Sequence, residues 1–332
     1  MLTGSYDKHV RIWNDANELV HSFAAQDSTI TALKVIKCKD DQIEIITASK
    51  DETMKSYQVD PINKKHRLIQ TFEGHEGSIS SLDFLIEKDS QDAIDIVSSG
   101  WDNTILLWIY DHQEASQPSN KNNNKKKKQA KSKRKIQEIS RENLPESEDP
   151  SIKRPDFKFN GHKQKVSVVK WLDNERIVSG SNDNTIKIWD SSSGINIQTL
   201  YGNRAVTCMD ISIENNFFVS GHNDNRLRLW DPRSNESENM KRIFKSHKGW
   251  ISSVSINPNN QNYFVSSSHD KTVKLWDVRS SIPLFSLPES KDKVLASVWK
   301  NNNEDSENDY ILQGGADTKL TISKISKQIS KN

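Results

Sequence analysis

The sequence predicts an all-β fold, a seven-bladed β-propeller, and two observations lead to it. The first is a repeat, because a phrase in which Ser precedes Asp by a few residues recurs along the 332-residue chain. The anchors of the seven copies are Asp7, Asp51, Asp102, Asp183, Asp224, Asp270 and Asp317. Repeats of about 40 to 45 residues that hold several short strands are typical of propellers.

The second observation is the alternation of polar and apolar residues in short runs. Residues 185–190 (TIKIWD) and 272–277 (TVKLWD) alternate, so that their apolar side chains share one face of a strand. A further apolar run lies upstream in each unit, as at 166–171 and 251–256. Asn-Asp or His-Asp then marks a tight turn between strands. Four strands per unit is the number that a propeller blade requires.

The spacing of the anchors also predicts the domain organisation. Residues 1–110 hold blades one to three, and residues 158–332 hold blades four to seven. Residues 111–157 interrupt the repeat and are expected to be a disordered basic insertion. Its tract at 121–135 holds nine Lys or Arg and no acid, although the net charge of the whole chain is only +2.

The basic tract is a candidate for nuclear localisation or RNA contact. Its candidate residues are Lys125, Lys126, Lys127, Lys128, Lys131, Lys133, Arg134 and Lys135. The alternative is a solvated low-complexity insertion without a partner. RNA binding by this tract would weaken steeply with added salt.

The two ends of the chain suggest an incomplete seam. The segment MLTGSYDKHVRIW supplies the second and third strands of blade one, and its innermost first strand is missing. Blade seven ends with only SKQISKN after its third strand. We therefore expect the native protein to extend upstream of Met1. A natural propeller with an open seam is the alternative.

These features resemble the WD-repeat family, with Trp-Asp at 189–190, 230–231 and 276–277 and Gly-His at 74–75 and 161–162. The resemblance implies a buried hydrogen-bonded chain of His, Ser, Asp and Trp in a blade. The matching sets are His75, Ser98, Asp102 and Trp108; His162, Ser179, Asp183 and Trp189; and His247, Ser266, Asp270 and Trp276. Blade five has Asn203 where His is expected, so we expect it to be looser.

Longer phrases narrow the resemblance, among them KSHKGWISSVSINP (245–258), DKVLASVW (292–299) and ILQGGADTKL (311–320). They are similar to the WD-repeat subunits of the Pescadillo–Bop (PeBoW) complex. That resemblance implies a scaffold in nucleolar assembly of the large ribosomal subunit and in pre-rRNA maturation. It implies a Bop-type WD-repeat partner that holds Pescadillo, pre-60S particles, and a location in the nucleus, nucleolus and nucleoplasm.

The same resemblance implies an N-terminal ubiquitin-like domain that engages an AAA-type ATPase. We expect this sequence to lack that domain. We therefore expect the contact with the ATPase only in a full-length family member. A ubiquitin-ligase substrate receptor or a chromatin reader is the alternative function.

Propellers usually bind partners through the turns that carry the Asp anchors. Exposed aromatic and cationic residues near these turns are therefore docking candidates. They are Tyr6, Trp101, Arg204, Trp250, His269 and Lys293. The alternative is that their rings pack against neighbouring blades.

The sequence contains no combination of residues that indicates an enzyme, a cofactor site or a metal site. The Ser-His-Asp sets recur and each ends in Trp, which favours a structural role over nucleophilic catalysis. The nine histidines lack the spacing of metal ligands, and Cys38 and Cys208 are too far apart in the sequence for a zinc motif. No run of about 18 apolar residues indicates a membrane span.

Overall fold

The structure is a computed structural model that describes residues 1–14, 16–39, 42–86, 93–111, 149, 151–234, 239–300 and 308–326. The regular structure of these residues is β throughout, in seven sheets, and the fold is a seven-bladed β-propeller, which confirms the prediction. The chain divides into two compact units, residues 1–178 with 188–198 and residues 179–187 with 199–332. In the described part of the chain, no helix has the length and apolarity that a membrane crossing requires.

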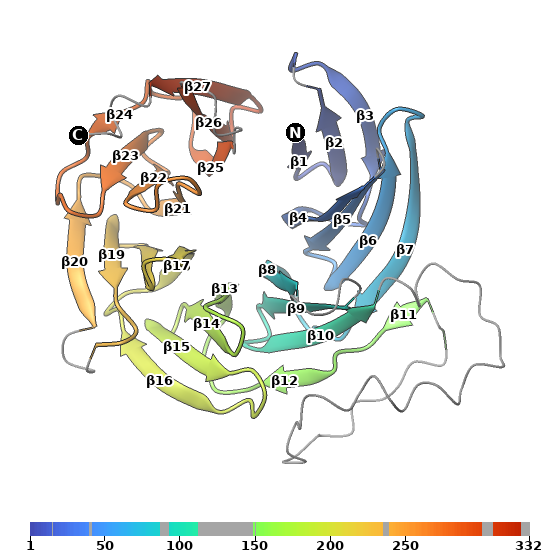
Figure 1. Cartoon of the computed structure of the whole chain (residues 1–332), viewed down its shortest axis with the longest axis horizontal. Coiled ribbons are helices and arrows are strands. Elements are labelled where there is room, and N and C mark those ends of the chain that lie inside the picture. The colour runs from blue at the N-terminus through green and yellow to red at the C-terminus, as the bar shows by residue number, and fades with distance from the viewer. Residues whose placement is uncertain are drawn as a thin grey trace. The chain divides into compact units, whose positions relative to one another are not determined.

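The first three blades belong to the first unit (Figure 1). Blade one has three strands, β1 (Leu2–Gly4), β2 (His9–Trp13) and β3 (Leu19–Ala24). Blade two begins with β4 (Ile30–Lys39), β5 (Gln42–Ser49), β6 (Thr53–Asp60) and β7 (Lys65–Glu73). Blade three begins with β8 (Ile79–Ile86), β9 (Ala93–Gly100) and β10 (Ile105–Asp111).

The end of the expected insertion is part of these blades, so the predicted boundary at 157/158 lies too far along the chain. Strand β11 (Ile152–Lys153) pairs with β7 in parallel, and β12 (Phe157–Phe159) pairs with β10 as the outer strand of blade three (Figure 1). Asp156 holds the segment in place, since its carboxylate accepts the N–H of Ile109 at 2.8 Å. Residues 112–148, which contain the basic tract, lie outside the described residues.

The remaining blades follow in chain order. Blade four has the strand order β13 (Val166–Trp171), β14 (Arg176–Ser181), β15 (Thr185–Asp190) and β16 (Asn196–Tyr201). Blade five has β17 (Val206–Ser212), β18 (Phe217–His222), β19 (Arg226–Trp230) and β20 (Met240–Lys245). Blade six has β21 (Ile251–Ile256), β22 (Tyr263–Ser268), β23 (Val273–Asp277) and β24 (Phe285–Ser286). The described residues of blade seven form three strands, β25 (Val294–Lys300), β26 (Asn308–Gly315) and β27 (Leu320–Ser326).

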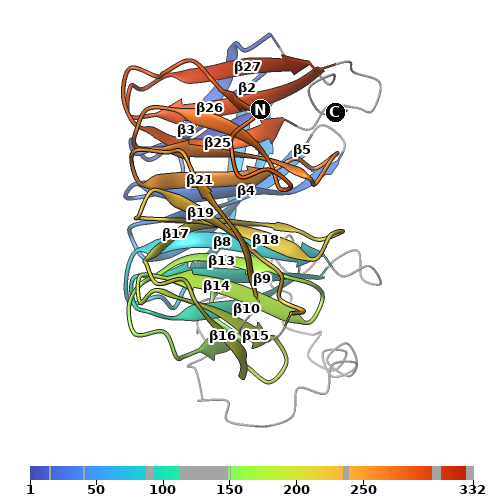
Figure 2. The same ribbon diagram turned by 90° about the vertical axis from the view of Figure 1, so that its left-hand side faces the viewer.

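Strand periodicity explains how the blades pack on one another. Successive side chains of a strand point to opposite faces, so a blade between two others buries both sets. On β22, Phe264 joins the core shared with blade five, whereas Val265 joins the core shared with blade seven. Figure 2 shows β17, β21 and β25 as successive layers of the second unit, which agrees with the contacts of β21 with both others.

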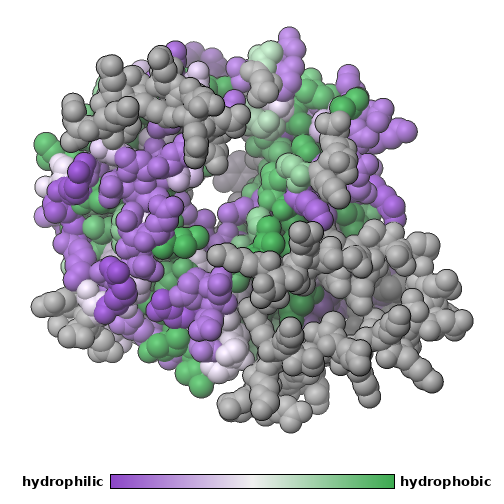
Figure 3. Space-filling view, in the orientation of Figure 1, coloured by the Kyte–Doolittle hydropathy of each residue, from purple (hydrophilic) through white to green (hydrophobic). Residues whose placement is uncertain are grey.

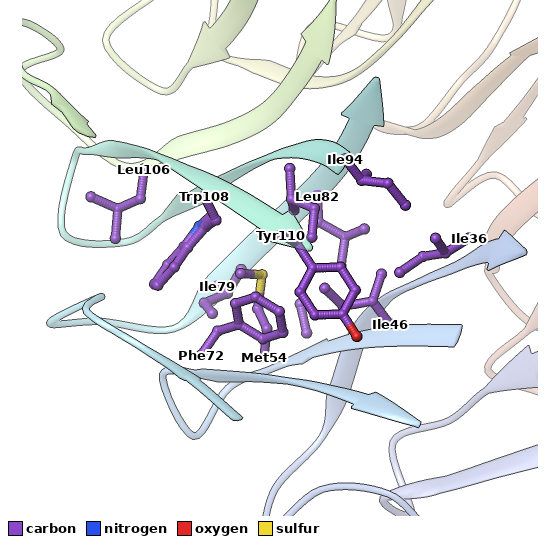
Figure 4. Close-up of a cluster of buried hydrophobic side chains, with 12 residues drawn as sticks. Ile36, Ile46, Met54, Phe72, Ile79, Leu82, Ile94, Leu106, Trp108 and Tyr110 are labelled. Atoms are coloured by element: carbon purple, nitrogen blue, oxygen red, sulfur yellow. The ribbon is translucent and has the colours of Figure 1, made fainter. Parts of the chain in front are cut away.

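The first unit has the same kind of core between blades two and three. Trp108 and Phe72 are fully buried there and meet edge to face, with ring centroids 5.7 Å apart (Figure 4). Ile46, Met54 and Tyr110 complete the contact with aliphatic and aromatic surface. On the face of the second unit seen in Figure 3, hydrophilic residues predominate and hydrophobic ones are scattered between them.

The Asp anchors shape the turns. In all seven blades the residue after the anchor has a positive φ, between 61° and 73°. These residues are Lys8, Glu52, Asn103, Asn184, Asn225, Lys271 and Thr318. The Asp carboxylate accepts the N–H two residues further on, as from Thr104 to Asp102 at 3.0 Å and from Thr272 to Asp270 at 3.0 Å. This bond holds a turn that L-residues rarely adopt by themselves.

Candidate docking surface and the hydrogen-bond chains beneath it

The predicted chain of blade three is present as a continuous set of hydrogen bonds. Trp108 Nε1 donates to Ser98 Oγ at 2.9 Å, and Ser98 Oγ lies 2.8 Å from His75 Nε2. His75 Nδ1 lies 2.7 Å from Asp102 Oδ2, which also accepts the N–H of Glu76. All the bonds are satisfied when Ser98 donates to His75 and His75 donates to Asp102. The chain thus links two strands, the Asp turn and the segment after β7.

Blade six contains the same arrangement. Trp276 Nε1 donates to Ser266 Oγ at 2.8 Å, and Ser266 Oγ lies 2.8 Å from His247 Nε2. His247 Nδ1 lies 2.8 Å from Asp270, whose carboxylate also accepts the N–H of Lys248. The agreement of two blades in every partner indicates a repeated structural device.

The predicted members of blade four are divided between the two compact units. In the first unit, the rings of His162 and Trp189 have centroids 5.9 Å apart. In the second, Asp183 accepts the N–H of Thr185 at 3.0 Å, and Ser179 is fully buried. A complete chain through these four residues stays a prediction.

Blade five has a histidine in its hydrogen-bond chain although Asn203 stands where His was expected. His222, two residues after Ser220 on the same strand, replaces the missing histidine: its Nε2 lies 2.7 Å from Ser220 Oγ, which accepts Trp230 Nε1 at 2.7 Å. Burial and the charge of Arg228 lower the pKa of His222 to about 4, so the ring is neutral at pH 7. Gly202 makes room for it, because a Cβ there would lie 2.8 Å from His222 Cε1.

The sequence analysis missed His222, although a signal was present. Blade five reads SGHND at 220–224 where blade four reads SGSND at 179–183. In blades three and six the anchor Asp binds the histidine of the chain. In blade five the anchor Asp224 pairs with the Arg228 guanidinium at 2.7 Å.

These chains are buried, which bears on their chemistry. Ser98 is fully buried and already accepts the Trp108 N–H, so its hydroxyl has no access to a substrate carbonyl. Burial raises the pKa of Asp102, but the hydrogen bond and charge of His75 and the N–H groups of Thr104 and Glu76 outweigh it and hold that pKa at about 2. The geometry fits a structural role. Among the described residues, no group of three or more His, Cys, Asp or Glu side chains could hold a metal ion.

Above the chain of blade three lies Trp101, one of the predicted docking residues. It directly precedes Asp102, and 55% of its surface is exposed. The ammonium of Lys165 lies 4.5 Å from the centre of its ring, within cation–π range. Tyr6, 63% exposed, holds the equivalent place in blade one, with Lys50 Nζ 5.5 Å from its ring centre. Both rings are therefore exposed on turns that hydrogen bonds hold in shape.

The other predicted docking residues lie in the second unit. Trp250 is 56% exposed and stacks with His269, with ring centroids 6.0 Å apart. Lys293 and Arg204 are exposed on the turns that precede β25 and β17. The candidates thus include exposed aromatic rings on each of the two units.

A pocket of about 380 Å³ in the first unit escaped the sequence analysis. Its lining residues are Asp51, Glu52, Thr53, Glu73, Gly74, His75, Glu76, Arg154 and Pro155. Arg154 and Pro155 were assigned to the insertion, so their approach to blades two and three was not foreseen. Arg154 pairs with Glu73 at 3.3 Å.

Comparison with known proteins places these features in a family. The family described as WD domain, G-beta repeat matches residues 66–108, 153–190, 194–231 and 238–277. A ribosome biogenesis protein WDR12 homolog of Oryza sativa subsp. japonica is 33% identical over 335 residues, covering 97% of this chain and 70% of that protein. Homologs of the same name from Nematostella vectensis and Arabidopsis thaliana are 30% and 29% identical, covering 72% and 70% of those proteins. The chain belongs to the WDR12 family of WD-repeat proteins.

Proposed function

We propose that this protein is a non-enzymatic scaffold in the assembly of the large ribosomal subunit. The observation that carries the proposal is its likeness, over 97% of the chain, to relatives named for ribosome biogenesis. The finer proposal is that the propeller binds a Bop-type WD-repeat protein and, through it, Pescadillo on pre-60S particles. That role requires a location in the nucleus, chiefly the nucleolus and nucleoplasm.

The exposed aromatic residues of the first unit support docking of a protein. Trp and Tyr are enriched among residues that dominate binding energy, because they bury a large area at a small entropic cost. Trp101 and Tyr6 are already fixed by rigid turns, so little order has to be gained on binding. Arg204, Trp250, His269 and Lys293 stay proposed for the same role in the second unit.

Affinity purification of the tagged chain with mass spectrometry tests the proposal. We expect a Bop-type protein, Pescadillo and large-subunit precursors to be recovered. The combined change Tyr6→Ala and Trp101→Ala should reduce that recovery without lowering stability. Recovery of cullin or histone partners alone would support the ubiquitin-ligase or chromatin alternative and refute the proposal.

The expected ubiquitin-like domain stays a prediction, as does the contact with an AAA-type ATPase. The contact is testable only in a family member that carries the domain. RNA binding through Lys125–Lys128, Lys131, Lys133, Arg134 and Lys135 also stays a proposal.

A further inference from the structure

Trp250 is an exposed indole on a turn that is bonded to the turn of His269. Its carbonyl accepts the backbone N–H of His269 at 2.9 Å, and the two rings lie at 27° to each other. Gly249 allows the two turns to approach, because a Cβ there would lie 2.7 Å from the backbone nitrogen of Asp270. The ring therefore stacks on His269 while more than half of it stays open to solvent.

Four exposed lysines lie on the turns next to this ring: Lys248, Lys271, Lys291 and Lys293. Contacts between their turns bring them together. Lys271 Nζ donates to the carbonyl of Lys291 at 3.2 Å, and Lys248 donates its N–H to Asp270, next to His269. Burial and the charge of Lys293 both lower the pKa of His269.

The lysine ammonium groups outnumber the exposed carboxylates on these turns, four to two. Within the described part of the chain none of the four ammonium groups is in an ion pair. Asp270 is committed to His247, and the exposed Glu289 and Asp292 are the other acidic side chains of these turns. The surroundings of Trp250 are therefore cationic.

We propose that Trp250 and these four lysines form a site for single-stranded RNA, with a base stacked on the indole and phosphates held by the ammonium groups. Every base has a face that can stack on an aromatic ring, and Lys binds phosphate as a point charge. Lysine is depleted at protein–protein interfaces, whereas the turns next to this ring carry four lysines. The site goes beyond the proposed function and does not depend on it.

The chain supplies a matched control in Trp101. It is as exposed as Trp250, but Lys165 already lies over its ring and the neighbouring turn carries Glu76 in place of a lysine. Trp101→Ala should therefore leave RNA binding unchanged. The basic tract could bind RNA by itself, so each variant is also made in a chain whose eight candidate Lys and Arg residues in that tract are changed to Gln.

The experiment measures binding of the full chain to a fluorescein-labelled single-stranded RNA of about 12 nucleotides by fluorescence anisotropy across a salt series. Trp250→Ala should weaken binding at least about fivefold in both backgrounds, the low end for loss of one stacked base. Trp250→Phe should retain most of the affinity. The pair Lys291→Gln and Lys293→Gln should reduce the log–log salt slope by about 1.4, or roughly 0.7 per phosphate contact.

Wild-type affinity of Trp250→Ala in the tract-substituted chain would overturn the proposal. An equal loss on duplex RNA would also overturn it, because a paired base offers no free face. If Trp250→Ala kept its RNA affinity but lost the protein partners recovered by affinity purification, the surface would be a protein-docking site. Thermal melts check the fold of each variant, and the lysine pair keeps the test decisive if Trp250→Ala is unstable.

Discussion

Replacing Ser98 by Ala should destabilise the protein far more than its size suggests. Ser98 Oγ is the point where the blade-three chain joins, since it accepts Trp108 Nε1 at 2.9 Å and lies 2.8 Å from His75 Nε2. Both of these side chains are shielded from solvent. Loss of the hydroxyl leaves two buried nitrogen groups without partners, at about 1–3 kcal/mol each. The expected loss is therefore about 2–6 kcal/mol, a large part of a typical stability of about 5–15 kcal/mol.

Urea unfolding, followed by tryptophan fluorescence and circular dichroism, measures this loss as a shift in midpoint at unchanged slope. Ser22→Ala is the matched control, because Ser22 is exposed on β3. It should change the free energy of unfolding by less than about 0.5 kcal/mol. If Ser98→Ala were as stable as Ser22→Ala, the buried chain would contribute nothing and the reasoning would be refuted.

Three further predictions concern titration and the blade boundary. The pKa of His222 is lowered to about 4, so its contribution to the free energy of unfolding is complete above pH 6.5 and falls by about 3 kcal/mol as the pH drops toward 4. His222→Gln should flatten the dependence of stability on pH between about 4.5 and 7, and an unchanged slope would contradict this. Asp102 has a pKa of about 2 against an ordinary 3.8, so it stabilises the fold above pH 3.8 and loses that stabilisation as the pH falls toward 2. In acid denaturation, Asp102→Asn should remove roughly 2 kcal/mol of the pH dependence of stability, and a wild-type acid profile would count against the assignment. Asp156→Ala should cost about 1 kcal/mol in urea, since it leaves the Ile109 N–H without its acceptor, and no change would show that β12 is held by other contacts.

The number of blades and the buried hydrogen-bond chains could be predicted because both repeat along the sequence. Seven Asp anchors with strand alternation between them leave few other folds, and the chains of blades three and six follow the residues expected from the Gly-His and Trp-Asp positions. His222 escaped prediction because a histidine can reach the same hydroxyl from a different backbone position once Gly202 leaves space. The spacing of residues along the sequence does not show that a histidine can reach the hydroxyl from another position.

Composition misassigned the end of the insertion for a related reason. Residues 151–159 follow a charged tract and hold Lys153, Arg154 and Asp156, but β11 and β12 pair with the sheets and Phe159 is buried in the core beside Trp189. The exposure of the turn aromatics could be foreseen from their places beside the anchors. Their surroundings could not, since Lys165 reaches Trp101 from a different blade.

The most direct test of the account is sedimentation of the tagged chain on a sucrose gradient, probed for precursor rRNA of the large subunit. We expect the wild-type chain to sediment with pre-60S particles and the Tyr6→Ala, Trp101→Ala chain to shift to the light fractions while remaining folded. A wild-type chain found only in the light fractions, or a double variant that still sediments with the particles, would contradict docking through these turns.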